Sequence, residues 1–171
     1  MEIIEVKEKS RLLVLVIALL LVGCASIPKY ANIQSYDSIR KYDYVYVTPA
    51  GTKNSVSGSS YGNQFGTYGT TSSKSINPAE IISGRFMKAG MVPVPELRKE
   101  TNAKTIVVNY SETGRHNKFM GYSIEVTIQL IDAATYDVIC TATAEGMGDT
   151  ETDDVRKAIN KCMDAILNDV Q

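Results

Sequence analysis

The clearest pattern in the chain is a strict alternation of apolar and polar residues between positions 122 and 130. The even-numbered positions are apolar: Tyr122, Ile124, Val126, Ile128 and Leu130. The odd-numbered positions between them are polar: Ser123, Glu125, Thr127 and Gln129. A period of two predicts a strand with one buried and one solvated face, as in an antiparallel sheet. Residues 132–136 supply a tight turn into a second strand over 137–145, whose inward residues are Val138, Cys140, Ala142 and Ala144.

Three other segments read as strands. Residues 42–48 place Val45 and Val47 on one face and three tyrosines, Tyr42, Tyr44 and Tyr46, on the other. The segment 105–110 repeats the alternation with Ile106, Val108 and Tyr110. The segment 91–94 contains a proline and is followed by another, which predicts a short strand at an edge of the sheet.

Two segments carry helical signals. Asn77 can cap a helix over 78–89, with Pro78 at the first helical position and Gly90 after the last turn. Thr150 and Asp153 form a capping pair for a second helix over about 151–168, whose apolar residues recur every three to four positions. One or two further helical turns are expected over 96–101.

This order of elements predicts an α+β fold: a mainly antiparallel sheet of four to five strands with two main helices packed on one face. It forms a single domain over 42–171. Residues 24–41 show no sustained period, which predicts a tether. Glycine, serine and threonine make up 16 of the 25 residues over 51–75, a composition that predicts a long mobile loop.

The amino terminus has the features of an export signal. Positions 12–22 read LLVLVIALLLV, after the basic residues Lys7, Lys9 and Arg11. Eleven apolar residues fall far short of the roughly 20 that cross a bilayer as a helix. The run ends in Leu21-Val22-Gly23-Cys24, which resembles the lipobox of bacterial lipoproteins.

That resemblance implies a signal peptide over 1–23 and lipidation of the Cys24 thiol, which would anchor the chain to a membrane. Ala25 after the cysteine favours the outer membrane, with the domain facing the periplasm. The alternative is that Cys24 is an ordinary thiol that follows a secretory signal or a membrane anchor.

The charge balance and the few histidines and cysteines exclude some classes of function. The 18 basic and 19 acidic residues give a net charge of −1, so the chain has no basic field for nucleic acid. His116 is the single histidine, and Cys24, Cys140 and Cys162 are the three cysteines. Because a structural zinc site needs about four nitrogen or sulfur ligands, we expect no metal site. We also expect no cofactor. Cys140 and Cys162 are expected to be buried, unbridged thiols, although a disulfide is the alternative.

Candidate catalytic groups have simpler interpretations. Glu112, Arg115 and His116 are expected in a solvated turn between strands. Four acidic residues could suggest calcium, but their positions at a helix start suit the helix dipole instead: Asp149, Glu151, Asp153 and Asp154. There is no Gly-x-Ser-x-Gly or Ser-x-x-Lys nucleophile motif with its partners. The sequence therefore predicts no catalytic residues and a protein that is not an enzyme.

Aromatic residues are the candidates for a binding surface. Tyr61, Phe65 and Tyr68 lie within the Gly/Ser-rich segment, and Tyr42, Tyr44 and Tyr46 lie on one face of a predicted strand. Aromatic rings next to Asn and Gln can stack on sugars or on another protein. The alternative is a flexible loop whose rings fold back over the sheet.

The order of elements, together with the strand-turn-strand segment from Leu130 to Val138, resembles a module of small periplasm-facing lipoproteins. These include the amino-terminal domain of TolB, the periplasmic domain of the curli secretion-channel lipoprotein and the lipoprotein activators of penicillin-binding proteins. The resemblance implies a non-enzymatic accessory or assembly factor that binds another cell-envelope protein. A glycan- or peptidoglycan-binding module that uses the loop aromatics is the alternative. The long amphipathic strands of a barrel wall are not predicted, so no pore function is carried over.

Overall fold

The computed structural model describes residues 27–63, 66–119 and 121–168, with 57–63 and 66–72 as backbone only. The elements follow in the order β1 (Asn32–Ser35), η1 (Ile39–Lys41), β2 (Tyr44–Val47), β3 (Lys53–Asn63), β4 (Gly66–Ile76), α2 (Pro78–Lys88), β5 (Val92–Pro93), η2 (Asn102–Lys104), β6 (Thr105–Lys118), β7 (Gly121–Asp132), β8 (Val138–Gly146) and α3 (Glu151–Asn168). Within those residues, neither helix is long and apolar enough to cross a membrane. Cys24 and the predicted signal peptide lie outside the described residues.

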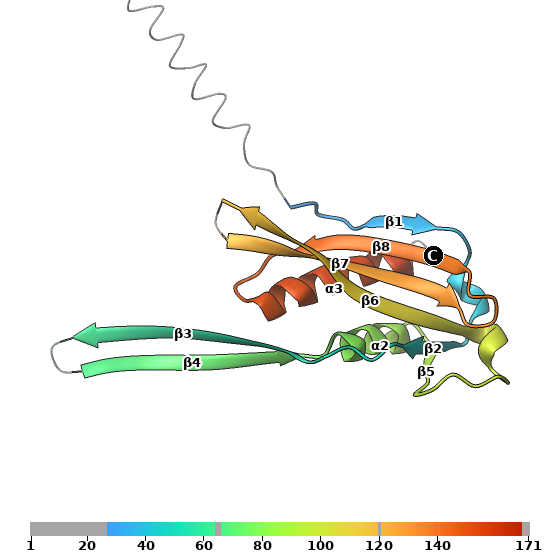
Figure 1. Ribbon diagram of the computed structural model, residues 1–171, viewed down its shortest axis with the longest axis horizontal. Coiled ribbons are helices and arrows are strands. Elements are labelled where there is room, and N and C mark those ends of the chain that lie inside the picture. Colours follow the sequence, from blue (N-terminus) through green and yellow to red (C-terminus); the bar gives the residue numbers. More distant parts are fainter. Residues whose placement is uncertain (1–26, 64–65, 120, 169–171) are drawn as a thin grey trace, which may run out of the picture.

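Six strands form the main sheet, in the order β1-β8-β7-β6-β2-β5 (Figure 1). The pairs β6–β7, β7–β8 and β1–β8 are antiparallel, whereas β2 is parallel to both β6 and β5. The fold is α+β, as predicted. The sheet is mixed, because a long crossover through β3, β4 and α2 returns the chain beside β2 in the same direction. It has six strands rather than four to five, because β1 joins it from the predicted tether.

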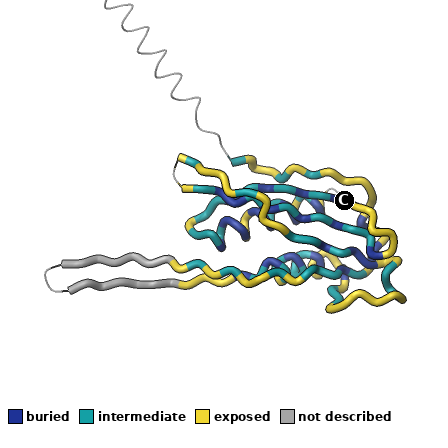
Figure 2. Tube along the Cα trace, in the orientation of Figure 1, coloured by how far each residue is buried: buried dark blue, intermediate teal, exposed yellow. Residues whose placement is uncertain are grey.

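Both helices pack on one face of this sheet and enclose the core (Figure 2). The inward positions of β7 are fully buried, with Val126, Ile128 and Leu130 each 0 % exposed. From the helices, α2 contributes Ile82 and Phe86, and α3 contributes an apolar stripe made of Val155, Ala158, Ile159, Cys162, Met163 and Ile166. The alternation therefore predicts the buried face of β7 and β8 correctly, except at Val138. This residue is 37 % exposed and Ile139 is buried instead, because the register between β7 and β8 shifts at Leu130 and Ile131.

The predicted helix signals are confirmed. The Asn77 side chain accepts a hydrogen bond of 3.0 Å from the Ala79 amide at the start of α2. Gly90 follows its last turn with a φ of +93°, in the left-handed region that favours glycine. At α3, the Asp153 amide donates to Thr150 Oγ1 over 3.3 Å, and Thr150 Oγ1 donates to the Asp153 carboxylate over 2.9 Å.

The segment 51–75, which the sequence predicts as an irregular loop, contains most of a β-hairpin. β3 and β4 pair antiparallel along their full length, from Lys53 opposite Ile76 to Asn63 opposite Gly66. Ser, Thr, Val and Tyr tolerate extended backbone, and a hairpin ladder pairs the backbone groups that face the other strand without needing an apolar face. The prediction of a loop is therefore wrong in secondary structure. Its mobility stays a prediction.

The predicted tether also contains structure. β1 pairs with β8 from Asn32 opposite Thr143 to Ser35 opposite Cys140, and the Tyr36 amide donates to the carbonyl of Ile139 over 2.8 Å. Ile33 is the one apolar residue of this strand and packs against the core. A four-residue edge strand with one inward side chain shows too little alternation of apolar and polar residues to be recognised in a sequence.

Two smaller differences concern β6 and the region before it. β6 continues to Lys118 rather than ending at Tyr110, with a register shift between Glu112 and Gly114. Residues 96–101 do not form the expected helical turns, and a short 3₁₀ turn, η2, follows them instead. The extension of β6 places Glu112, Arg115 and His116 in a strand, so the predicted turn is wrong for them, although all three are exposed as expected.

Candidate functional site

The face of the sheet opposite the helices carries polar side chains from three adjacent strands. Thr113 in β6 lies 3.2 Å from Thr127 in β7, and Thr127 lies 2.9 Å from Thr143 in β8, measured between hydroxyl oxygens. The pairs Gln129–Thr141 and Asn109–Gln129 continue this surface in the strand register. We call it the open face, because both helices lie on the other side of the sheet (Figure 1).

The six aromatic residues predicted as a binding surface are divided among three places. Tyr44 and Tyr46 are half-buried and alternate with the buried Val45 in β2, which puts them on the open face. Tyr61 and Tyr68 are directly opposite each other in the hairpin register. Phe65 lies outside the described residues.

Tyr42 belongs to the core instead. Its side chain is 4 % exposed, and its hydroxyl donates to Asp132 Oδ2 over 2.6 Å. Burial and this hydrogen bond raise the pKa of Tyr42 to about 12. Assigning Tyr42 to a binding surface was therefore wrong: β2 begins only at Tyr44, and the residue before the strand turns inward.

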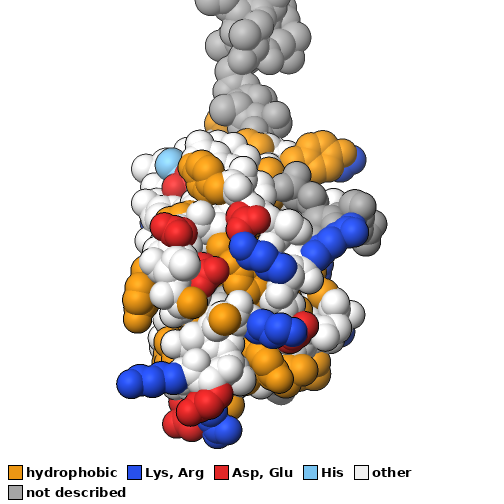
Figure 3. Space-filling view, turned by 90° about the vertical axis from the view of Figure 1, so that its right-hand side faces the viewer, with side chains coloured by type: hydrophobic (Ala, Val, Ile, Leu, Met, Phe, Trp, Pro, Cys, Tyr) orange, Lys and Arg blue, Asp and Glu red, His pale blue; other side chains and the backbone are white. Residues whose placement is uncertain are grey.

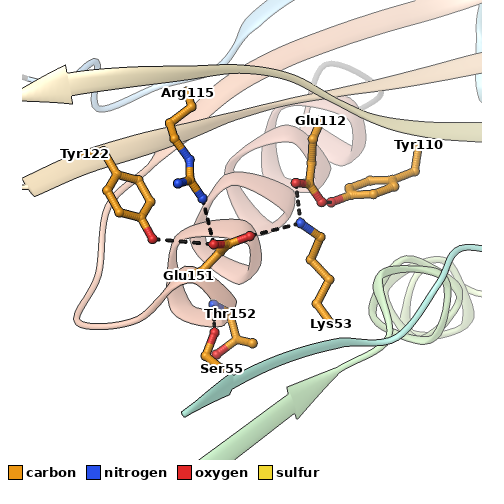
Figure 4. A network of polar contacts seen from close by, with 8 residues as sticks. All are labelled: Lys53, Ser55, Tyr110, Glu112, Arg115, Tyr122, Glu151 and Thr152. Carbon is orange, nitrogen blue, oxygen red and sulfur yellow. Dashed lines mark hydrogen bonds and ion pairs between the residues drawn. The ribbon is translucent and has the colours of Figure 1, made fainter. Parts of the chain in front are cut away.

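The base of the hairpin is fastened to the body by ion pairs (Figure 4). Lys53 at the start of β3 pairs with Glu112 of β6 and, over 3.2 Å, with Glu151 of α3. Arg115 contacts the second oxygen of Glu151 over 2.7 Å and lies over the ring of Tyr122. These contacts join the hairpin, the sheet and the start of α3.

Two further contacts complete what we call the hairpin clamp. Ser55 Oγ accepts a hydrogen bond of 3.0 Å from the Thr152 amide, which lies in the first turn of α3 and has no acceptor within the helix. Lys74 of β4 pairs with Asp153 over 2.7 Å. The clamp therefore consists of Lys53, Ser55 and Lys74 from the hairpin and Glu112, Glu151, Thr152 and Asp153 from the body.

The charges in the clamp stabilise one another. Partial burial opposes ionisation of Glu151, but Lys53 and Arg115 outweigh it and lower the pKa of this carboxyl. Likewise, Glu112 and Glu151 raise the pKa of Lys53 in spite of its partial burial. Burial and a hydrogen bond to Glu112 raise the pKa of Tyr110, so its hydroxyl remains a neutral donor.

Three of the four acidic residues considered for calcium have other partners, and the fourth, Asp149, is exposed in the loop before α3. Glu151 and Asp153 belong to the clamp. Asp154 is 3 % exposed and accepts a hydrogen bond from the Gly148 amide, and burial raises the pKa of its carboxyl. These contacts agree with acidic side chains that stabilise a helix start.

The structure separates the predicted group of Glu112, Arg115 and His116. Glu112 and Arg115 lie on the helix side, in or beside the clamp, whereas His116 lies near Glu125 and Glu145 on the open face. Sequence reasoning missed this second group. The alternation places Glu125 on the polar face, and the pairing of β7 with β8 brings Glu145 opposite it, so the available signal was the register.

An open cleft of about 860 Å³ lies between η1, the end of α2 and the end of α3. Arg85 and Lys88 line it on one side, with Asp43 and the apolar Met91 and Leu167 nearby. Arg85 is paired with Asp164. Basic and acidic side chains are interspersed among hydrophobic ones in the end-on view of Figure 3.

Comparison with known proteins gives no family. No protein-family model matches the sequence, and no curated protein matches it. Among solved structures, the chain is similar to the PelC dodecamer from Paraburkholderia phytofirmans, with 16 % identity over 82 % of this chain and 98 % of that chain and a TM-score of 0.46. A variant of the same PelC dodecamer gives 15 % identity over 80 % and 97 % of the two chains and a TM-score of 0.47.

Proposed function

We propose that this chain is a lipid-anchored protein of the bacterial cell envelope that binds another envelope protein and catalyses no reaction. The anchor is lipid on Cys24, and the folded domain faces the periplasm from the outer membrane. The apolar run followed by Leu21-Val22-Gly23-Cys24 supports the anchor. Neither a cofactor nor nucleic acid has a part in this function.

The β3–β4 hairpin is the observation that carries the binding proposal. Its described polar contacts with the body come from Lys53, Ser55 and Lys74, all within two residues of the strand ends. Figure 1 shows the two strands running outward from the body. Eleven residues per strand span about 35 Å, and a two-stranded hairpin alone is only marginally stable in water.

A partner strand could stabilise the hairpin by pairing with one of its edges. In this mode the backbone supplies the hydrogen bonds, and side chains at alternate positions supply the specificity. Tyr61 and Tyr68 are opposite each other in the register, and tyrosines are frequent among the residues that contribute most to binding energy. Tyr44 and Tyr46 on the open face offer a second contact.

Photocrosslinking in cells tests this proposal. The variant Tyr61→p-benzoylphenylalanine keeps an aromatic ring at this position of the hairpin and adds a photoreactive benzoyl group. The matched control carries the same group at Lys88, which is exposed on α2. We expect a crosslinked envelope protein from position 61 and none from position 88. Equal crosslinking from both positions, or none from position 61, would refute the hairpin as the binding element.

The anchor is tested separately. We expect Cys24→Ser to move the protein from the membrane fraction to the soluble fraction, because the lipid attaches to this thiol. The comparison is made on salt-washed membranes, with Cys140→Ser as the matched control. Retention of the Cys24→Ser protein on washed membranes would show that lipid on Cys24 is not what holds it.

A glycan is the second candidate ligand, favoured by the Tyr61–Tyr68 pair, because aromatic side chains can stack on sugar rings. Pull-down with purified peptidoglycan separates the two functions. A glycan binder should be retained by peptidoglycan and should lose that retention in the double variant Tyr61→Ala, Tyr68→Ala. A chain that is not retained does not bind this glycan.

A further inference from the structure

We propose that His116, Glu125 and Glu145 form a binding site for one divalent first-row transition-metal ion on the open face. The three residues come from the adjacent strands β6, β7 and β8, and we call them the three-strand cluster. One ligand atom from each lies within 4.8 Å of the other two. The sequence argument against a metal site counted only nitrogen and sulfur ligands. It did not consider one imidazole together with two carboxylates.

The register brings two like charges together. Glu125 lies directly opposite Glu145 in the pairing of β7 with β8. Their side chains are only 28 % and 18 % exposed. Like charges opposite each other on neighbouring strands are destabilising, and partial burial increases the repulsion. A cation between the two carboxylates relieves it.

The ligand atoms are close to the spacing of a metal site. His116 Nε2 lies 3.5 Å from Glu125 Oε2 and 4.0 Å from Glu145 Oε1. Ligands about 2.0–2.1 Å from a tetrahedral metal ion are roughly 3.3 Å from one another. Side-chain shifts of less than about 1 Å therefore bring the three atoms to binding distance.

Each carboxylate is oriented through its other oxygen. Thr113 Oγ1 donates to Glu125 Oε1 over 2.7 Å. Ser123 Oγ and Lys118 Nζ contact Glu145 Oε2 over 2.8 and 2.9 Å. The remaining oxygen of each residue is the one that faces His116, which is the arrangement of metal ligands held by surrounding hydrogen bonds. Lys118 is the cation already present and competes with the metal for Glu145.

Gly114 makes room for the imidazole. A Cβ at this position would lie 3.0 Å from His116 Nε2 and 3.4 Å from its Cε1. The ring therefore passes over a backbone position where a side chain would displace it. Gly114 is opposite Glu125 in the register. Because Gly114 has no side chain, His116 Nε2 can approach the Glu125 carboxylate.

The ligand set selects the class of metal. Imidazole favours ions such as Zn²⁺, Co²⁺ and Ni²⁺ over Mg²⁺ and Ca²⁺, which prefer oxygen ligands only. Three protein ligands leave at least one coordination position open. Because the His116 side chain is 45 % exposed, this position is accessible from solvent and the metal should exchange readily.

Zinc binding to the full-length protein in detergent, stripped of metals beforehand, tests the site. We expect equilibrium dialysis to give one Zn²⁺ per chain. His116→Ala and Glu125→Gln should each weaken binding at least tenfold, and Thr113→Val and Gly114→Ala should weaken it by roughly tenfold through the orientation of the ligands. Glu96→Gln, on the loop after β5, is the matched control and should bind as the unmodified chain does.

Nuclear magnetic resonance of the imidazole gives a second readout. Because His116 is the one histidine of the chain, its ring nitrogen signals need no assignment to a residue, and couplings within the ring distinguish Nδ1 from Nε2. We expect stoichiometric Zn²⁺ to shift the Nε2 signal and to leave Nδ1 protonated. The absence of stoichiometric zinc binding, an unchanged affinity in His116→Ala or an unshifted Nε2 signal would overturn the proposal.

Discussion

The two faces of the central sheet use the same strands for different purposes. On the covered face, Val126, Ile128 and Leu130 of β7 are fully buried under the helices. On the open face, the intervening Thr127 and Gln129 are half-buried. The Thr127 hydroxyl contacts those of Thr113 and Thr143, and Gln129 lies opposite Asn109 and Thr141 in the register. The comparison shows that apolar packing against the helices specifies the fold on the covered face. The open face is not needed for that packing and can carry polar groups for binding.

The largest expected effect comes from removing a side chain of the covered face. We expect Ile128→Ala to lower the free energy of unfolding by about 2–5 kcal/mol, because it leaves a cavity at a fully buried position. The neighbouring Gln129→Ala is the matched control on the open face and should change stability by less than about 0.5 kcal/mol. Urea denaturation measures both. Similar losses from the two variants would mean that the open face is covered in solution.

A smaller loss of stability is expected from removing the contact between Tyr42 and Asp132 at the end of β7. Tyr42→Phe removes the 2.6 Å hydrogen bond to Asp132 and should cost about 1–2 kcal/mol near neutral pH, since the acceptor is charged. Burial opposes ionisation of Asp132, but this hydrogen bond and those from the amides of Ala134 and Thr135 lower the pKa of its carboxyl.

The same pair has a defined pH dependence. Because the pKa of Asp132 is lower in the folded chain than in the unfolded chain, its stabilisation is present above about pH 4 and is lost as the pH falls through the folded value. The stability difference between the native protein and Tyr42→Phe should therefore shrink on acidification. A difference that stays constant from pH 6 to pH 2.5 would contradict the role of the charged acceptor.

Weakening the hairpin clamp should loosen the hairpin while leaving the rest of the sheet unchanged. Glu151→Gln weakens the contacts with Lys53 and Arg115 and should cost at most about 1 kcal/mol, because the pairs are partly exposed. We expect faster amide hydrogen exchange in β3 and β4 and little change in β7. Asp164→Asn, which affects the pair with Arg85 at the other end of α3, is the control. Unchanged exchange in the hairpin would show that the clamp does not hold it.

The smallest expected effect is that of a reductant. Cys140 and Cys162 are buried thiols rather than a disulfide, as the sequence predicts, and burial raises the pKa of Cys162 to about 12. Dithiothreitol should therefore leave the thermal midpoint unchanged, and the denatured, unreduced protein should titrate both thiols. A midpoint that falls on reduction would reveal a bridge between β8 and α3.

The covered face could be predicted from the sequence because alternation and helical spacing record burial directly. Ile128 and Ile159 are both inward residues in such patterns and both are 0 % exposed. The parallel pairing of β2 with β6 could not be predicted, because strand direction depends on the path of the chain between the two strands. The hairpin could not be predicted either, since its Gly, Ser and Thr residues show no apolar face.

Candidate sites were harder to predict, because they depend on register. The positions of Tyr44 and Tyr46 on one face follow from alternation, but Tyr42, with the same parity, precedes the strand and turns into the core. The approach of His116 to Glu125 and Glu145 depends on two strand pairings and a register shift near Gly114. No local pattern records that combination.

For the lipid anchor proposed on Cys24, the pairing of β1 with β8 limits the distance between the domain and the membrane. Asn32 follows Cys24 by eight residues, so a fully extended segment reaches about 28 Å at roughly 3.5 Å per residue. Without β1, the first residue held in the core would be Ile39, and the free segment would reach about 50 Å. In a lipidated chain, β1 would therefore keep the near side of the domain within about 28 Å of the bilayer surface. A partner anchored in the same membrane would need only a short reach to meet it.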